Sequence, residues 1–129
     1  MGSGVEVTQV LSMALVGRDE VISARLSYRG EDPFAVSVVF TVGGVHVQWT
    51  FGRDLLRDGL CAPAGHGDVM VAPAGGGRVS LTLRSGSGLA MLACDAADVA
   101  VFVRRMYAAV PDGAESTHWA IDQFLADIA

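Results

Sequence analysis

The sequence predicts an α+β domain with two antiparallel β-sheets, each followed by a helix. Apolar residues alternate with polar ones through most of residues 5–94, which is the period of a half-buried strand. Glycine pairs and triplets separate these runs, and residues 95–110 change to the three- and four-residue spacing of a helix. A chain of 129 residues fits one domain, so we assign residues 1–129 to a single domain.

The first predicted sheet is a four-stranded meander. Its strands are expected at residues 5–15, 22–28, 34–42 and 45–51. Gly43 and Gly44 predict a tight hairpin, because a two-residue type I′ turn needs positive φ at both positions. The last strand places four apolar side chains on one face, which we expect in the core: Val45, Val47, Trp49 and Phe51.

A short helix over residues 53–60 interrupts the strands, and Gly59 is expected to be its C-cap. A loop rich in glycine and proline then leads to a short strand containing Val69 and Val71. Pro73 is expected to end that strand, because proline cannot donate to a β-ladder. Two further strands, at 79–83 and 89–94, complete the second predicted sheet.

The end of the chain is predicted to be helical. Asp95 is a suitable N-cap for a helix that reaches Val110, and Arg104 and Arg105 suit its C-terminal end. Pro111 and Gly113 stop this helix. A last short helix, capped by Thr117 or Asp122, would place four apolar residues on one face: Ile121, Phe124, Leu125 and Ile128.

The composition favours a protein-binding domain. Hydrophobic residues make up 51% of the chain and charged residues 18%, which is apolar for so small a domain. Such an excess predicts an apolar patch that self-association or a partner buries, although a compact core with small apolar residues on its surface is the alternative. The net charge of −5 and the absence of Lys argue against nucleic acid as the main partner.

The most tempting chemical group is Cys61, His66 and Asp68, which could form a nucleophilic relay. Their loop offers no rigid presentation, so we interpret Asp68 as a turn residue. The histidines His46, His66 and His118 lack partners at metal-ligand spacing. Cys61 and Cys94 are expected to be buried free thiols. We therefore predict a non-enzymatic protein with no cofactor and no metal site. Nothing resembles a signal peptide, which predicts a cytoplasmic protein.

Several stretches together resemble the SsgA/SsgB-like family of sporulation and cell-division proteins. Tyr28 and residues 32–36 resemble its second and third strands, residues 49–60 its most specific stretch, and residues 110–115 its tail. The residues that mark the family fold, without being a proven site, are Asp32, Pro33, Trp49, Phe51, Arg53, Asp54, Leu56, Gly59, Gly67 and Asp68. The family subtype, SsgB-like or a paralogue, is left open by these residues.

The resemblance implies an adaptor of sporulation-specific septation in actinomycetes, which recruits or positions the tubulin-like division protein FtsZ at the septum. It also implies a fold like that of the whirly and mitochondrial guide-RNA-binding proteins, a homotrimer, and family paralogues as further partners. Contact with the membrane would be indirect at most. The alternative function is a single-stranded nucleic-acid-binding module of the whirly-like fold, against which the acidic charge weighs.

Overall fold

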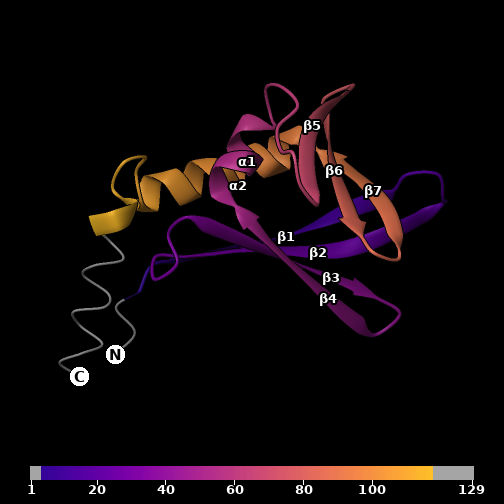
Figure 1. The fold of residues 1–129 in the computed structure, drawn as a ribbon, viewed down its shortest axis with the longest axis horizontal. Coiled ribbons are helices and arrows are strands. Elements are labelled where there is room, and N and C mark those ends of the chain that lie inside the picture. The colour runs from indigo at the N-terminus through magenta and orange to yellow at the C-terminus, as the bar shows by residue number, and fades with distance from the viewer. Residues whose placement is uncertain (1–3, 118–129) are drawn as a thin grey trace.

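The computed structural model describes residues 4–117. Seven strands and two helices follow one another in this part of the chain: β1 (Glu6–Leu15), β2 (Glu20–Arg29), β3 (Ala35–Val42), β4 (Val45–Gly52), α1 (Arg53–Asp58), β5 (Val69–Gly75), β6 (Arg78–Ser85), β7 (Gly88–Asp95) and α2 (Ala96–Ala109). Figure 1 shows their arrangement. Residues 115–117 are helical again, and the predicted face of the last helix lies outside the described residues.

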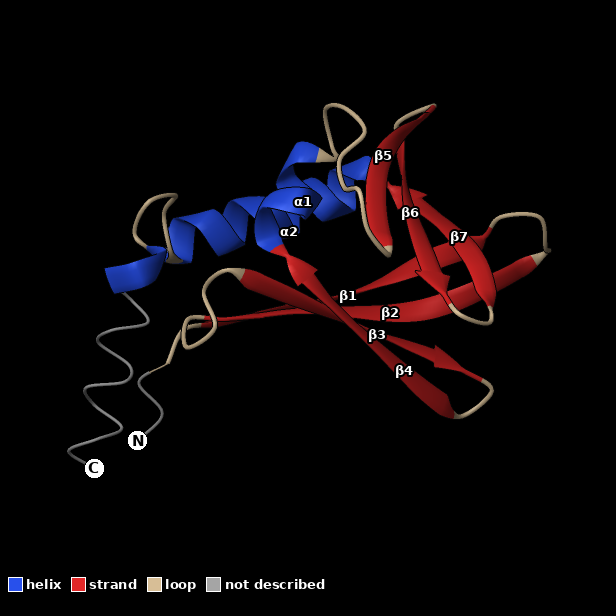
Figure 2. Ribbon diagram, viewed as in Figure 1, coloured by secondary structure: helices blue, strands red, loops and turns tan. Residues whose placement is uncertain are grey.

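The strands form one antiparallel sheet with the order β4-β3-β2-β1-β7-β6-β5, so the prediction of two separate sheets is wrong. The two halves are joined at the end of β1, where Ala14 pairs with Ala93 and Leu15 with Leu92, and where the N–H of Val16 donates to the carbonyl of Met91. Figure 2 shows the sheet curled, with β5, β6 and β7 running at a steep angle to the first four strands. In each of these two pairs the partners lie nearly 80 positions apart in the chain. Such distant pairing leaves no local pattern in the sequence, so the join between the two halves could not be predicted.

The first four strands form the predicted meander. β1 and β2 pair in register over ten residues, from Glu6 opposite Arg29 to Leu15 opposite Glu20. The predicted hairpin between β3 and β4 is confirmed, because Gly43 and Gly44 have φ values of 54° and 81°. Burial alternates along β2 and β3, with one face of each strand buried and the other turned toward solvent. This explains why alternating apolar and polar residues predict these strands.

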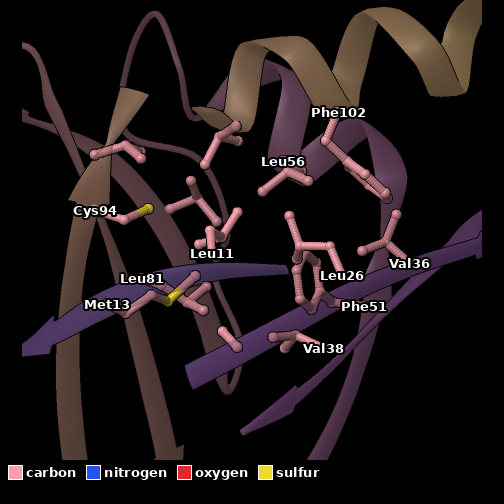
Figure 3. Close-up of a cluster of buried hydrophobic side chains, with 14 of the residues drawn as sticks. Leu11, Met13, Leu26, Val36, Val38, Phe51, Leu56, Leu81, Cys94 and Phe102 are labelled. Carbon is pink, nitrogen blue, oxygen red and sulfur yellow. The ribbon is translucent and has the colours of Figure 1, made fainter. Parts of the chain in front are cut away.

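The core lies between the concave face of the sheet and the two helices. Figure 3 shows Leu56 of α1 and Phe102 of α2 above Leu26 and Phe51 of the sheet. The buried positions of α2 recur at three- and four-residue steps, as the sequence predicts: Val99, Phe102, Val103 and Met106. α2 therefore buries one stripe on the sheet and leaves the other in water.

Two side chains attach α2 to β1 where the sheet divides. Gln9 donates to the carbonyl of Asp98 at 2.7 Å, and Arg105 donates to the carbonyl of Thr8 at 3.0 Å. Arg105 and its neighbour Arg104 lie before the last turn of α2, so their predicted place at the helix C-terminus is wrong. Asp95 is the N-cap residue, as predicted, but its side chain makes no capping hydrogen bond.

Two positions around β5 differ from the sequence-based expectation. Pro73 does not end β5, because it pairs with Val79 before a bulge that reaches Gly75. β5 is the last strand of the sheet, where a missing N–H is tolerated. Gly59 is the C-cap of α1, but in a right-handed conformation with φ −67°. Its need for glycine is steric, since a Cβ there would lie 2.3 Å from Cγ1 of Val71.

Candidate interaction surface

A buried arginine lies at the start of α1. Arg53 is 1% exposed, and its Nη1 donates to the carbonyl of Val110 at 2.7 Å. Its Nη2 donates to Oε2 of Glu115 at 2.9 Å, and Glu115 is itself buried. Because a charge this deep must be paired, the contacts tie α1 to the segment that follows α2.

Two tyrosines enclose the same guanidinium. The Arg53 carbon Cζ lies 3.9 Å from the ring centroid of Tyr107 and 5.3 Å from that of Tyr28. Tyr28 donates its hydroxyl hydrogen to the carbonyl of Pro33 at 2.9 Å, and burial raises the pKa of this hydroxyl. The arginine therefore packs as part of the core with Nη1 and Nη2 hydrogen-bonded, while its Nε has no partner among the described residues.

Glu115 is held ionised by its partners. The hydrogen bond from Arg53 lowers the pKa of the Glu115 carboxyl, and the backbone N–H of Gly113 donates to its Oε1 at 2.8 Å. The turn after α2 is thus fixed by a carboxylate that both a buried arginine and its own backbone stabilise.

A second, exposed layer of charges surrounds this pair. Tyr107 donates to Oδ1 of Asp54 at 2.6 Å, while Arg57 pairs with Asp58 at 3.0 Å and with Asp112 at 3.1 Å. The carboxylates of Asp54, Asp112 and Glu115 come within 4.8 Å of one another, a spacing that could hold a cation. Guanidinium groups and the Tyr107 hydroxyl already occupy them, so we assign this cluster a structural role.

An apolar groove of about 430 Å³ lies away from the helices, between the β3–β4 hairpin and the β6–β7 hairpin. In Figure 2 the tips of these hairpins extend beyond the part of the sheet that α1 and α2 cover. The predicted core position of Val45 and Val47 is wrong, because they are 60% and 44% exposed, whereas Phe51 at the other end of β4 is buried and Trp49 is half-buried. Apolar and polar residues alternate along β4 up to the hairpin tip, but the helices that cover the core do not extend that far.

Side chains from both hairpins, and from the end of β1 and the start of β2, line this groove. Those that the sequence pattern had assigned to strand interiors include Ile22, Phe40, Val47, Trp49, Leu83 and Leu92, and Arg18 and Glu20 stand among the polar ones. Leu89, at the start of β7, is 57% exposed. A continuous apolar surface of this kind on a small domain is typical of a site that binds another protein.

The residues of the hypothetical relay lie on the surface. Cys61, His66 and Asp68 are all exposed, and among the described residues no hydrogen bond joins any two of them. Asp68 lies in a bend just before β5, and its carbonyl accepts a hydrogen bond from the N–H of Arg84, which extends the pairing of β5 with β6. Cys61 was wrongly expected to be buried. Cys94 is buried as expected, and this burial raises the pKa of its thiol to about 11.

The ten family-marking residues fall into three groups in the structure. Pro33, Phe51, Arg53, Leu56 and Gly59 are buried, and Trp49 is half-buried. Asp32, Asp54, Gly67 and Asp68 are exposed. Asp32 forms the turn before β3, since its N–H donates to Arg29 and its carbonyl accepts from Ala35.

Sequence reasoning missed the depth of Arg53 and the open end of the β4 face. The first had one signal, because Arg53 precedes Leu56 by three residues and shares its helix face. The partners Tyr107 and Glu115 lie more than 50 positions away and gave none. The open end of the β4 face could not be predicted, since the apolar residues of a strand recur with the same period whether or not other elements cover them.

The model of the SsgA family, described as Streptomyces sporulation and cell division protein, matches residues 22–115. The chain belongs to the SsgA family. The matched range includes Arg53 and Glu115, and so both partners of the buried ion pair. The resemblance of residues 28–60 and 110–115 to this family is therefore confirmed.

Similar members of the family are sporulation-specific cell division proteins named SsgB. The one from Kineococcus radiotolerans is 46% identical over 110 residues, which is 81% of this chain and 67% of that protein. The one from Streptomyces coelicolor is 42% identical over 83% of this chain and 81% of its own. An SsgA-like sporulation-specific cell division protein from Thermobifida fusca has a solved structure that matches with a TM-score of 0.88 and 33% identity, covering 100% of this chain and 99% of that one.

Proposed function

We propose that this SsgA-family chain acts in sporulation-specific cell division as a non-catalytic adaptor, which recruits or positions the FtsZ ring at septum sites. The carrying observation is the 42–46% identity to proteins called sporulation-specific cell division protein SsgB, over four fifths of the chain. The proposed location is the cytoplasm at the division septum. Within residues 4–117, no helix is long and apolar enough to cross a membrane.

The geometry supports a binding role more than a catalytic one. The ion pairs of Arg53 and Arg57 join structural elements, and their tyrosine and carboxylate partners are occupied by these contacts. The apolar groove beyond the helices leaves apolar side chains exposed, so the stability of the fold does not account for it. A groove that exposes valines and a leucine suits contact with another protein chain.

Self-association is part of the proposal. The family resemblance implies a homotrimer with a whirly-like fold, and the exposed apolar residues of the β3–β4 hairpin support burial between copies. Sedimentation equilibrium of the purified chain tests this part. A mass of three chains is expected, and a single chain at all concentrations up to 100 µM, roughly the range in which weak complexes form, would contradict it.

The adaptor role is tested by co-sedimentation with FtsZ polymers assembled with GTP. The chain is expected in the pellet in proportion to FtsZ, and in the supernatant when GTP is omitted. The failure of any of it to pellet with polymers at micromolar concentrations would contradict direct recruitment. A salt titration of binding to a fluorescent single-stranded oligonucleotide checks the alternative function, for which a steep salt dependence would be needed.

A further inference from the structure

The sheet is open along one side of β1, beside its join to β7. β1 pairs with β2 over its whole length, but in the described part of the chain no residue of β1 before Ala14 pairs with β7. β7 ends at Asp95, and the chain continues as α2. The opening ends at Thr8, whose carbonyl accepts a hydrogen bond from Arg105 of α2. Six residue steps separate Thr8 from Ala14, so the opening is about 20 Å long.

The backbone of β1 has unpaired groups along this opening. The N–H of Val16 is bonded to β7 and the carbonyl of Thr8 to α2, so the even-numbered residues of β1 turn their backbone groups toward the opening. Between these two, Val10 and Ser12 have no hydrogen-bond partner on this side among the described residues. Their N–H and C=O groups are therefore available to another strand.

A cleft of about 530 Å³ lies along this stretch of β1. Val10 and Val21 line it, and they are 67% and 73% exposed, more than any other large apolar side chain within residues 4–117. Gln9 lines it too, and its Oε1 is buried without a hydrogen-bond partner in the described structure. A bound segment would remove the two valines from water and bring donors close to this oxygen.

The charges around the cleft favour a basic occupant. Asp95 and Asp98 line it and are exposed, and neither forms an ion pair with a described residue. Arg78 is the one basic residue of the lining, and its Nη2 is bonded to the carbonyl of Ala93 at 3.1 Å. The chain's own residues 118–129 contain two Asp and no Arg or Lys, so their charge opposes binding here.

We propose that this cleft binds an extended segment of a partner protein, which adds as a short strand beside Val10 and Ser12. Strand addition satisfies the unpaired backbone groups, and the alternation of a strand defines the sequence of the segment. Its residues on one face lie beside Val10 and are aliphatic. Those on the other face turn toward α2, where a Lys or Arg meets Asp98. The inference is independent of the role in recruiting FtsZ and of self-association.

A peptide of this pattern tests the cleft. The probe is fluorescein-labelled Thr-Val-Lys-Val-Lys-Val-Thr, and its binding to the 129-residue chain is followed by fluorescence anisotropy and by ¹⁵N NMR. The backbone amide signals of Val10 and Ser12 should be among those that shift most. The same peptide with Glu in place of Lys should bind at least tenfold more weakly. No binding of the Lys peptide up to about 1 mM, where weak complexes still form, or shifts confined to other residues, would overturn the proposal.

Two variants separate the backbone from the charge. Ser12→Pro removes an N–H that bonds to no described residue but blocks strand addition, so it should weaken binding at least tenfold. Asp98→Asn should weaken binding at least threefold, whereas Asp68→Asn, at an exposed aspartate outside the cleft lining, should not change it. Circular dichroism checks that each variant is folded. Unchanged binding by folded Ser12→Pro, or equal effects of the two Asp variants, contradicts the proposed site.

Sedimentation equilibrium distinguishes a different partner from a second copy of this chain. Wild type and Ser12→Pro should have the same mass in solution, because the proposed occupant is another protein. If folded Ser12→Pro loses an association that the wild type shows, a second copy occupies the cleft and the proposal is wrong.

Discussion

Arg53 concentrates more of the fold's polar bonding than any other side chain described around α1. It is buried between two tyrosine rings, and it bonds the carbonyl of Val110 and the carboxylate of Glu115. Removing one partner of a buried ion pair is strongly destabilising, because a charge is left buried and unpaired. Replacing all the paired residues by apolar ones can leave the stability nearly unchanged. Its contribution is therefore best measured by removing one partner at a time.

We predict that Glu115→Ala lowers the free energy of unfolding by about 3–5 kcal/mol, because it leaves the Arg53 guanidinium buried without its carboxylate. Urea unfolding followed by circular dichroism measures this. Asp112→Ala is the matched control, since it removes an exposed partner of Arg57 and should cost about 1 kcal/mol or less. Equal losses in the two variants would show that the buried pair is not special.

The same carboxylate predicts an acid dependence of stability. The pKa of Glu115 is lowered in the folded chain by its hydrogen bond from Arg53, so the ionised form stabilises the fold. This contribution is present above the unfolded pKa of about 4.3 and is lost as the pH falls through the lower folded value. In urea unfolding from pH 7 to pH 2, the wild type should lose more stability than Glu115→Gln, and the two curves should converge at low pH. Parallel curves would contradict this role.

Local patterns were sufficient for most of the elements. The four strands of the meander, α1, β6, β7 and α2 occur where periodicity and turn residues place them. The errors came from contacts between elements. Pro73 remains in β5 because that strand is an edge, and Gly59 is required by Val71 of β5 and not by a left-handed cap. The edge position of β5 and the contact of Gly59 with Val71 both depend on tertiary packing, so neither can be predicted from the residues next to Pro73 or Gly59.

Gly59→Ala should destabilise the packing of α1 on β5 by about 1–3 kcal/mol, because the new methyl group would overlap Val71. Thermal unfolding measures the loss. Adding Val71→Ala should not restore stability, because the Cβ and the carbonyl carbon of Val71 would still overlap the new methyl group. Gly67→Ala is the control, since a Cβ there meets nothing within 4 Å and Gly67 is not among the positive-φ glycines. A loss at Gly67 as large as that at Gly59 would refute the steric explanation.

At the scale of the whole molecule, the single curled sheet explains both the compact core and the uncovered groove. The helices cover the concave face only near the root of the hairpins, so the apolar face of β3 and β4 continues past them. The sequence predicts the strands of this face but not how far the helices extend over it, because the position of the helices depends on the join between β1 and β7. The same join determines that β4 is one end of the sheet that the described residues form.

The proposed self-association predicts that stability depends on protein concentration. When unfolding also dissociates the copies, the free energy of unfolding per chain rises by about 0.7 kcal/mol for each tenfold increase in concentration for a pair, and by about 0.9 kcal/mol for a trimer. Urea unfolding of the wild type between 1 and 100 µM, roughly two decades of concentration, measures this slope. A midpoint that does not change with protein concentration would contradict self-association.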